Sequence, residues 1–119
     1  MLEASAVIGQ ANFELMKTFL LQLVGRLDID RGNTRVSVVS YSADIVDSFK
    51  LGVHSSVTAL QAAISSLRYS GGSTNTAEAL KYIRTMILTS MAGAPIDVPK
   101  VVVTFTAGPS DDVRATQVY

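Results

Sequence analysis

Apolar side chains recur at spacings of three and four in the first third of the chain, which is the period of one helical face. Residues 12–27 are therefore predicted to form a helix with Asn12 as its N-cap. Its buried positions are expected to be Phe13, Met16, Leu20, Leu23 and Leu27, and further apolar residues widen this face, namely Leu15, Phe19 and Val24. The helix is expected to be largely covered, with Lys17 and Arg26 on its solvent side.

Two later segments carry the same helical period. Residues 57–67 are predicted to form a helix whose buried face consists of Val57, Leu60, Ile64 and Leu67. Another helix is expected from about residue 76 to residue 91, with an inward face made by Leu80, Ile83 and Ile87. The sequence Gly-Ala-Pro at residues 93–95 is expected to end it, because glycine and proline terminate helices.

Three other segments have the composition of strands. The runs at residues 35–41 and 45–51 are joined by so short a link that they must be antiparallel neighbours. Residues 100–106 are apolar in succession, which predicts a strand buried on both faces. Together with the helices, these strands predict an α/β fold. Its Rossmann-like, mostly parallel sheet has one antiparallel strand and helices on both faces.

Composition narrows the class of protein. The 119 residues are 48% hydrophobic and 17% charged, as in an ordinary globular domain. Ten basic residues balance ten acidic ones, so charge gives no reason to expect nucleic acid or a membrane surface as partner. The absence of cysteine excludes a disulfide framework and a thiolate metal site. No apolar run could insert into a membrane, and residues 1–6 do not resemble a signal peptide, so a secretion signal is expected outside this sequence.

Residues 69–80 combine two glycines with hydroxyl side chains at the predicted start of a helix. Asn75 is predicted to be the N-cap of that helix. Glu78 is placed three residues later to return a hydrogen bond to it, as in a capping box. The Thr74 and Thr76 hydroxyls can orient a ligand or coordinate a hard cation through oxygen. They can equally tie off the loop backbone, and the local sequence leaves both interpretations open.

Other polar residues do not form a catalytic pattern. His54 lacks the positioned carboxylate and serine of a catalytic triad. The Gly-Gly pair at residues 71–72 lacks the Gly-Lys-Ser/Thr ending of a phosphate-binding loop. The Arg-Gly-Asn sequence at residues 31–33 has Asn where an integrin-binding tripeptide has an acid, so it is interpreted as a turn. Asp111 and Asp112 are interpreted as helix-capping residues.

Several short motifs occur in order along almost the whole chain. They are Asn12-Phe13, Lys17-x-Phe19-Leu20, Thr34-Arg35-Val36 with Tyr41-Ser42, Phe49-x-Leu51, Gly71-Gly72-Ser73-Thr74-Asn75-Thr76 with Ala79-Leu80, Val98-Pro99-Lys100-Val101 and Thr106-x-Gly108-x-Ser110. In this order they resemble a von Willebrand factor type A domain, most of all the A domains of type VI collagen and its alpha-3 chain. Residues 1–119 are accordingly interpreted as one incomplete domain of this kind. The first central strand and the C-terminal elements of the family's pattern are expected to be missing.

The resemblance implies a place for a metal-ion-dependent adhesion site at the carboxyl ends of the strands. The family takes oxygen ligands from Asp-x-Ser-x-Ser, from a threonine of the glycine loop and from the Asp of Thr-Asp-Gly. The corresponding positions here are Glu3, Ser5, Val7, Thr74 and Ala107. Val7 and Ala107 have no ligating side-chain atom and Glu3 is longer than Asp, so a degenerate site and no bound metal are expected. Substituting Val7→Ser with Ala107→Asp is predicted to move the site toward metal competence.

Three classes of function compete. The predicted one is a secreted, non-enzymatic module of the extracellular matrix that needs no cofactor. Its partners would be matrix proteins, among them collagens or neighbouring A domains. The alternative is a Mg²⁺-dependent adhesion domain in which an acidic group of the ligand completes the coordination. A nucleotide-binding or hydrolytic enzyme is the third class, since α/β folds host many chemistries, but no phosphate loop or paired acid and base supports it.

Overall fold

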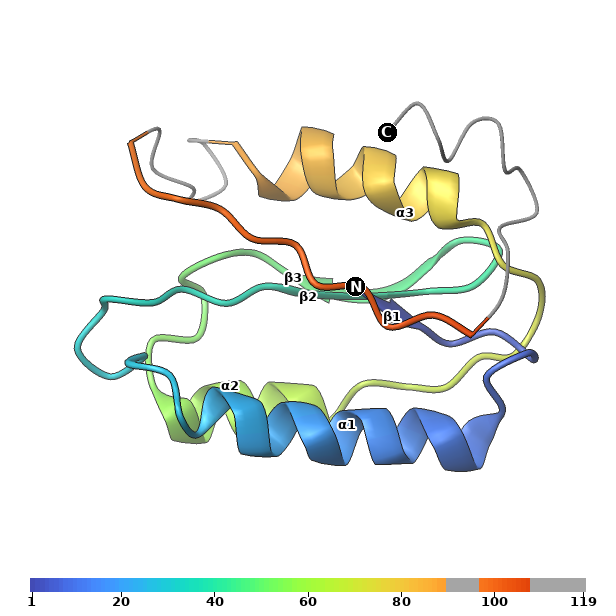
Figure 1. The fold of residues 1–119 in the computed structure, drawn as a ribbon, viewed down its shortest axis with the longest axis horizontal. Coiled ribbons are helices and arrows are strands. Elements are labelled where there is room, and N and C mark those ends of the chain that lie inside the picture. The colour runs from blue at the N-terminus through green and yellow to red at the C-terminus, as the bar shows by residue number, and fades with distance from the viewer. Residues whose placement is uncertain (90–96, 108–119) are drawn as a thin grey trace.

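The chain folds into a sheet covered by helices on both faces. The computed structural model describes residues 1–89 and 97–107. The elements follow in the order β1 (Leu2–Glu3), α1 (Gln10–Val24), β2 (Val38–Tyr41), β3 (Ile45–Phe49), α2 (Val57–Ser65), α3 (Thr76–Tyr82) and the π-helical turn η1 (Ile83–Ile87). Figure 1 shows α1 and α2 on one face of the sheet and α3 on the other. The predicted α/β fold class is confirmed.

The two-residue strand β1 lies between β2 and the segment that contains Phe105. It pairs in parallel with β2, with Leu2 opposite Ser40, and β2 pairs antiparallel with β3. On its other side Leu2 forms a parallel bridge with Phe105. The antiparallel pair is therefore as predicted. The fold was predicted to lack its first central strand, and only the two residues Leu2 and Glu3 form a strand beside β2.

The segment at residues 100–106 differs from its prediction. It contributes a bridge only at Phe105, whose N–H donates to the Met1 carbonyl oxygen at 3.0 Å. The three valines before it are exposed, by 83% at Val101, 44% at Val102 and 52% at Val103. The prediction of burial on both faces is therefore wrong. The physical reason is that β1 offers only two residues for pairing, and no other described strand flanks the segment.

Helix α1 begins two residues before the predicted cap. Gly9, with φ of 77°, is the N-cap. The predicted cap Asn12 lies inside the helix, where its side chain donates to the Ile8 carbonyl oxygen at 3.0 Å. The buried stripe of the helix is Phe13, Lys17, Leu20 and Val24. Leu15 and Phe19 are 66% and 51% exposed. The expectation of a largely covered helix is wrong, because the described structure packs against one stripe only.

The predicted starts of the two later helices are confirmed, since each has a local cap. The Ser56 hydroxyl accepts from the N–H of Ala59 at 3.1 Å, at the start of α2. The Asn75 side chain accepts from the N–H of Glu78 at 3.2 Å, at the start of α3. Such a cap is worth about 1 kcal/mol.

The reciprocal half of the predicted capping box is absent from the described hydrogen bonds. The N–H of Asn75 donates to the Ser42 carbonyl oxygen at 2.8 Å, so a tertiary partner has replaced Glu78. The predicted single helix over residues 76–91 consists of α3 and η1 and ends at Ile87. The proposed terminator at residues 93–95 and the capping aspartates 111 and 112 lie outside the described residues.

Two apolar clusters hold the layers together, one on each face of the sheet. The cluster under α1 and α2 contains Leu2, Ala4, Ile8, Phe13, Leu20, Val24, Ile29, Val38, Leu60, Ile64 and Leu67. The cluster under α3 and η1 contains Met1, Val39, Tyr41, Ala79, Ile83 and Ile87. Full burial of one large apolar side chain stabilises the fold by about 1.5–3 kcal/mol. Strand β2 contributes Val38 to the first cluster and Val39 and Tyr41 to the second, so it is packed on both faces.

Candidate site at the carboxyl ends of the strands

Three segments meet where β1 and its neighbours end. They are the turn after β1 at residues 4–9, the glycine loop at residues 69–75, and residues 105–107. The N–H of Gly71 donates to the Ala4 carbonyl oxygen at 2.8 Å, and the N–H of Ala6 donates to the Gly72 carbonyl oxygen at 2.9 Å. These two backbone hydrogen bonds hold the glycine loop against the turn after β1.

The glycines allow the loop to make this approach. Gly71 and Gly72 have φ of 73° and 85°, and residues other than glycine rarely adopt such positive φ angles. The Ser70 hydroxyl donates to Ser42 Oγ at 2.9 Å and thereby ties the loop to the end of β2. As a result Thr74 points into the protein, and only 3% of this residue is exposed to solvent.

The carboxylate of Glu3 is the centre of the site. Glu3 is fully buried. Its Oε2 accepts hydrogen bonds from the hydroxyls of Ser5 and, at 3.4 Å, Thr74. Its Oε1 accepts from the Thr106 hydroxyl at 2.5 Å and from the N–H of Ala107 at 3.3 Å. All four donors are neutral, and no Lys, Arg or His in residues 1–89 and 97–107 forms an ion pair with this carboxylate.

Tyr41 lies beside this cluster at the end of β2 and is fully buried. Its hydroxyl is 3.3 Å from Thr76 Oγ1. Burial raises the pKa of Tyr41 above its ordinary value, and the negative charge of Glu3 raises it further. Hydrogen bonds to Thr76 and Thr106 act in the opposite direction. Thr76, one of the two threonines singled out in the loop, thus contacts Tyr41 and not the carboxylate.

The structure brings together four of the five predicted site positions. Glu3, Ser5 and Thr74 contribute side chains, and Ala107 contributes only its backbone N–H. Val7 does not join them, because its side chain is 63% exposed on the surface. Two participants, Tyr41 and Thr106, were not among the predicted site residues. The only sequence signal for Thr106 was its place beside Ala107 in the Thr-x-Gly motif.

This donor set does not fit the cation that the family resemblance implies. Mg²⁺ takes six oxygen ligands in a near-octahedral arrangement, with carboxylates to offset its charge. Among the described residues the site offers one carboxylate, that of Glu3, and the hydroxyls around it direct their protons toward that carboxylate. No cluster of three His, Asp or Glu side chains occurs in the part of the chain that the structure describes.

The described residues also show no catalytic pair. His54 packs edge-on against the ring of Phe49, with ring centroids 4.8 Å apart, away from the carboxylate cluster. Within the described ranges, no helix has the length and apolar character of a membrane span.

A comparison with protein-family models decides the family. The model of the von Willebrand factor type A domain matches residues 1–118. The chain belongs to this family. The match extends over both the glycine loop and the Glu3 segment, so the site described above lies within the region that defines the family.

Among known proteins, the chain is similar in sequence to collagens and matrilins. The collagen alpha-4(VI) chain of Mus musculus is 39% identical over 114 residues, which are 94% of this chain and 5% of that protein. Matrilin-1 of Gallus gallus is 33% identical over 112 residues, covering 94% of this chain and 23% of the relative. The resemblance to type VI collagen is thus supported through an alpha-4 chain. The chain spans less than a quarter of the length of each of these two relatives.

Solved structures show the same fold. Proximal thread matrix protein 1 from the mussel byssus superposes with a TM-score of 0.87 at 22% identity, over 98% of this chain and 32% of that chain. A second structure of the same protein has a TM-score of 0.80 at 26% identity and covers 92% of this chain and 28% of that one. In that second structure the MIDAS motif, the metal-ion-dependent adhesion site, is occupied by zinc.

Proposed function

We propose that this chain is a non-enzymatic interaction module of a secreted extracellular matrix protein, and that it binds neighbouring matrix proteins without a metal. The family assignment and the likeness to a collagen and a matrilin support the matrix role. The single observation that carries metal independence is the engagement of the Glu3 carboxylate by four neutral donors from its own chain.

The absence of enzymatic activity is proposed from the chemistry at the same edge of the sheet. General acid–base catalysis needs a titratable group within hydrogen-bond reach of a substrate. In the described part of the chain, the ionisable groups gathered here are the buried carboxylate of Glu3 and the buried hydroxyl of Tyr41. Both are already hydrogen-bonded within the protein, so neither faces an open pocket as an acid or a base.

The partners proposed are collagens or neighbouring A domains of matrix proteins. The test is surface plasmon resonance of the chain over immobilised type VI collagen, in millimolar Mg²⁺ and again in excess EDTA. We expect the same affinity in both buffers, because no step of binding uses a cation. A loss of binding in EDTA would contradict metal independence, and absence of binding in both buffers would contradict the choice of collagen as partner.

A second candidate function is cation-dependent adhesion, and one observation favours it. A solved structure at 26% identity holds zinc in its MIDAS motif, and Glu3, Ser5 and Thr74 lie together here. A cation that binds only the folded state must raise the unfolding midpoint by mass action. Thermal unfolding followed by circular dichroism, with and without Mn²⁺ or Zn²⁺, separates the two functions. A midpoint unchanged by metal supports the first function, and a raised midpoint supports the second.

A further inference from the structure

The carboxylate of Glu3 connects three segments that are distant in the sequence. Ser5 follows β1, Thr74 belongs to the glycine loop, and Thr106 and Ala107 lie a hundred residues beyond Glu3. All four donate hydrogen bonds to the same two carboxylate oxygens. A bound cation would connect such segments through oxygen atoms acting as electron-pair donors. Here the arrangement is reversed, because an anion is at the centre and protons point toward it.

Hydroxyl groups make this reversal possible. A serine or threonine hydroxyl can accept through its lone pairs or donate its proton. The same Ser5 and Thr74 hydroxyls that suit a cation ligand set can therefore turn their protons toward a carboxylate. Charge-assisted hydrogen bonds of this kind are stronger than those between neutral groups. In the described part of the chain, no buried side-chain nitrogen or oxygen is left without a hydrogen-bond partner.

We infer that the Glu3 carboxylate takes the structural place of a cation, holds the three segments together, and by its length keeps cations out of the site. The inference rests on the metal independence proposed above and adds its cause. A cation entering the site would have to displace a fully buried carboxylate and four hydrogen bonds. Val7→Ser and Ala107→Asp move the residue types toward the family's ligand set, but they are then insufficient by themselves, because Glu3 still takes the place of the cation. Shortening Glu3 to Asp, which withdraws the carboxylate by one methylene, is also required.

Calorimetric titration with MnCl₂ tests the exclusion of cations. The proteins are the natural chain, Val7→Ser/Ala107→Asp, and the triple variant that adds Glu3→Asp. Residues 7 and 107 are exposed, so we expect the fold to tolerate both substitutions. The double variant is the matched control, because it differs from the triple variant by one methylene group only. We expect Mn²⁺ to bind the triple variant at least about tenfold more tightly than the double variant, which is a difference of about 1.4 kcal/mol.

The outcomes separate the two claims. Equal binding by the double and triple variants would overturn the inference, and so would a triple variant that binds no Mn²⁺. Mn²⁺ binding by the natural chain would contradict the proposed metal-independent function itself. Both claims are supported if the natural chain gives no heat of Mn²⁺ binding and the triple variant binds Mn²⁺ more tightly than the double variant.

A second measurement tests the connection between segments and does not depend on metal. Thr106→Val removes one donor to Glu3. Thr104→Val is the matched control on the same segment, because Thr104 makes no hydrogen bond to Glu3 within the described structure. We expect Thr106→Val to lower the thermal midpoint by roughly 4 °C or more, and Thr104→Val to change it by less than half as much.

The Glu3→Gln background isolates the contribution of the carboxylate. Glutamine keeps the shape of the side chain but removes its charge and one acceptor oxygen. The effect of Thr106→Val should shrink to less than half in this background. An undiminished effect would overturn the inference. If Glu3→Gln does not unfold cooperatively, equal midpoints for Thr106→Val and Thr104→Val in the natural background would overturn it instead.

Discussion

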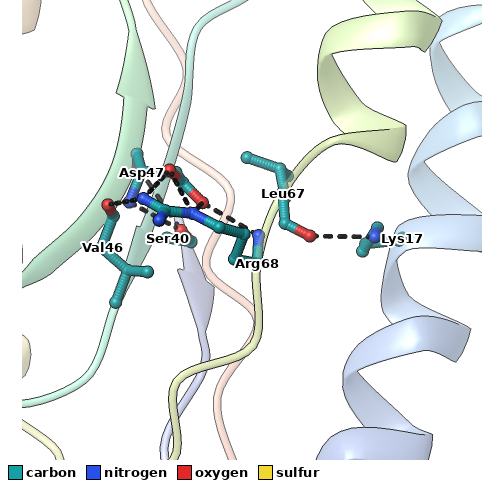
Figure 2. Close-up of polar contacts among 6 residues, drawn as sticks. All are labelled: Lys17, Ser40, Val46, Asp47, Leu67 and Arg68. Carbon is teal, nitrogen blue, oxygen red and sulfur yellow. Dashed lines mark hydrogen bonds and ion pairs between the residues drawn. The ribbon is translucent and has the colours of Figure 1, made fainter.

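The connection between α2 and α3 is held at its two ends by different chemistry. At its carboxyl end, the hydroxyl of Thr74 donates to the fully buried carboxylate of Glu3. At its amino end, charged side chains hold residues 67 and 68 from both sides. Lys17 Nζ on α1 donates to the Leu67 carbonyl oxygen at 2.9 Å, and Asp47 on β3 pairs with Arg68, as Figure 2 shows.

The ion pair at the amino end lies near the surface. Arg68 Nη2 is 2.9 Å from Asp47 Oδ1, and the N–H of Arg68 donates to Asp47 Oδ2 at 2.9 Å. The hydrogen bonds and charge of Arg68 lower the pKa of Asp47, while Asp47 raises the pKa of Arg68. The side chain of Arg68 is 73% exposed. Water and salt therefore screen this pair, and its contribution to stability is small.

The same arginine also covers an irregular place in the sheet. The register of β2 and β3 shifts between Ser40 and Tyr41, which leaves Val46 out of the pairing. The Arg68 guanidinium approaches the Val46 carbonyl oxygen at 3.5 Å (Figure 2). The Ser40 hydroxyl accepts from the N–H of Asp47 at 3.1 Å. Side chains thus compensate for the irregular backbone pairing of β3.

The comparison predicts that burial, more than formal charge, decides how much a polar contact contributes to stability. Glu3 has no cationic partner in the described structure, yet its removal would leave buried donors without an acceptor. Asp47 has a full ion pair, yet both groups can return to water. The contacts of Lys17 should contribute an intermediate amount to stability. Its Nζ is buried where it donates to the Leu67 carbonyl oxygen, but it also lies 3.3 Å from the exposed carboxylate of Glu14.

The largest effect should come from Glu3→Ala. It leaves the buried hydroxyls of Ser5 and Thr74 without their acceptor and creates a cavity, so a loss of about 3 kcal/mol or more in the free energy of unfolding is expected. Urea denaturation followed by circular dichroism measures it. Asp44→Ala, which removes an exposed carboxylate, is the control. A loss below about 1 kcal/mol for Glu3→Ala would contradict the importance assigned to the cluster.

Tyr41 should make the stability fall at alkaline pH. Its pKa is raised in the folded state, so the folded chain keeps a proton that the unfolded chain loses near pH 10. The contribution of Tyr41 to the free energy of unfolding is fully present below about pH 10 and is lost as the pH rises through the raised pKa of the folded state. The slope reaches about 1.4 kcal/mol per pH unit.

Comparison with Tyr41→Phe isolates this contribution. The variant lacks the hydrogen bond to Thr76 and should be less stable near neutrality. The difference between the two proteins should narrow above about pH 10, because only the natural chain titrates at this position. Urea unfolding at several pH values measures the difference. A constant difference up to about pH 11 would rule out the raised pKa as its source.

Lys17→Met should have an intermediate effect. Methionine keeps the apolar stem but leaves the Leu67 carbonyl oxygen without its donor, and a loss of about 1–2 kcal/mol is expected. Lys81→Met, at an exposed position, is the matched control and should be near neutral. Urea denaturation compares the two variants. Equal stability for both would show that the buried ammonium group does not hold the connection.

Asp47→Asn should have the smallest effect. Because Arg68 lowers the pKa of Asp47, the contribution of this group is present above the ordinary pKa of about 4 and is lost as the pH falls through the lower folded value. The natural chain and the variant should therefore converge in thermal midpoint under acid conditions, and also at high salt. A difference that persists in molar salt would indicate a contribution other than the screened ion pair.

Local sequence was sufficient for the elements with local causes. The cap at Asn75 depends on an N–H three residues away, so it can be recognised without tertiary information. The antiparallel pairing of β2 and β3 follows from the length of their link. The family assignment likewise followed from short motifs in order, and the match over residues 1–118 confirms it.

Predictions that depended on distant partners could not be made in this way. Lys17 was expected on the solvent side of its helix, and this was wrong, because its partner is the Leu67 carbonyl oxygen fifty residues away. Val101 was expected to be buried, but burial needs a second strand beside it. Likewise Glu78 lost its predicted bond to Asn75, since the Ser42 carbonyl oxygen takes that N–H in the folded chain.

By itself the sequence determined the order of the elements, the family, and the residue types at the carboxyl ends of the strands. It could show that Glu3 stands where the family has Asp and that Ala107 offers no carboxylate. Only the tertiary structure decided what those residues do together. The direction of a hydroxyl proton depends on which atoms surround it, and the partners of Glu3 lie 2, 71, 103 and 104 residues away.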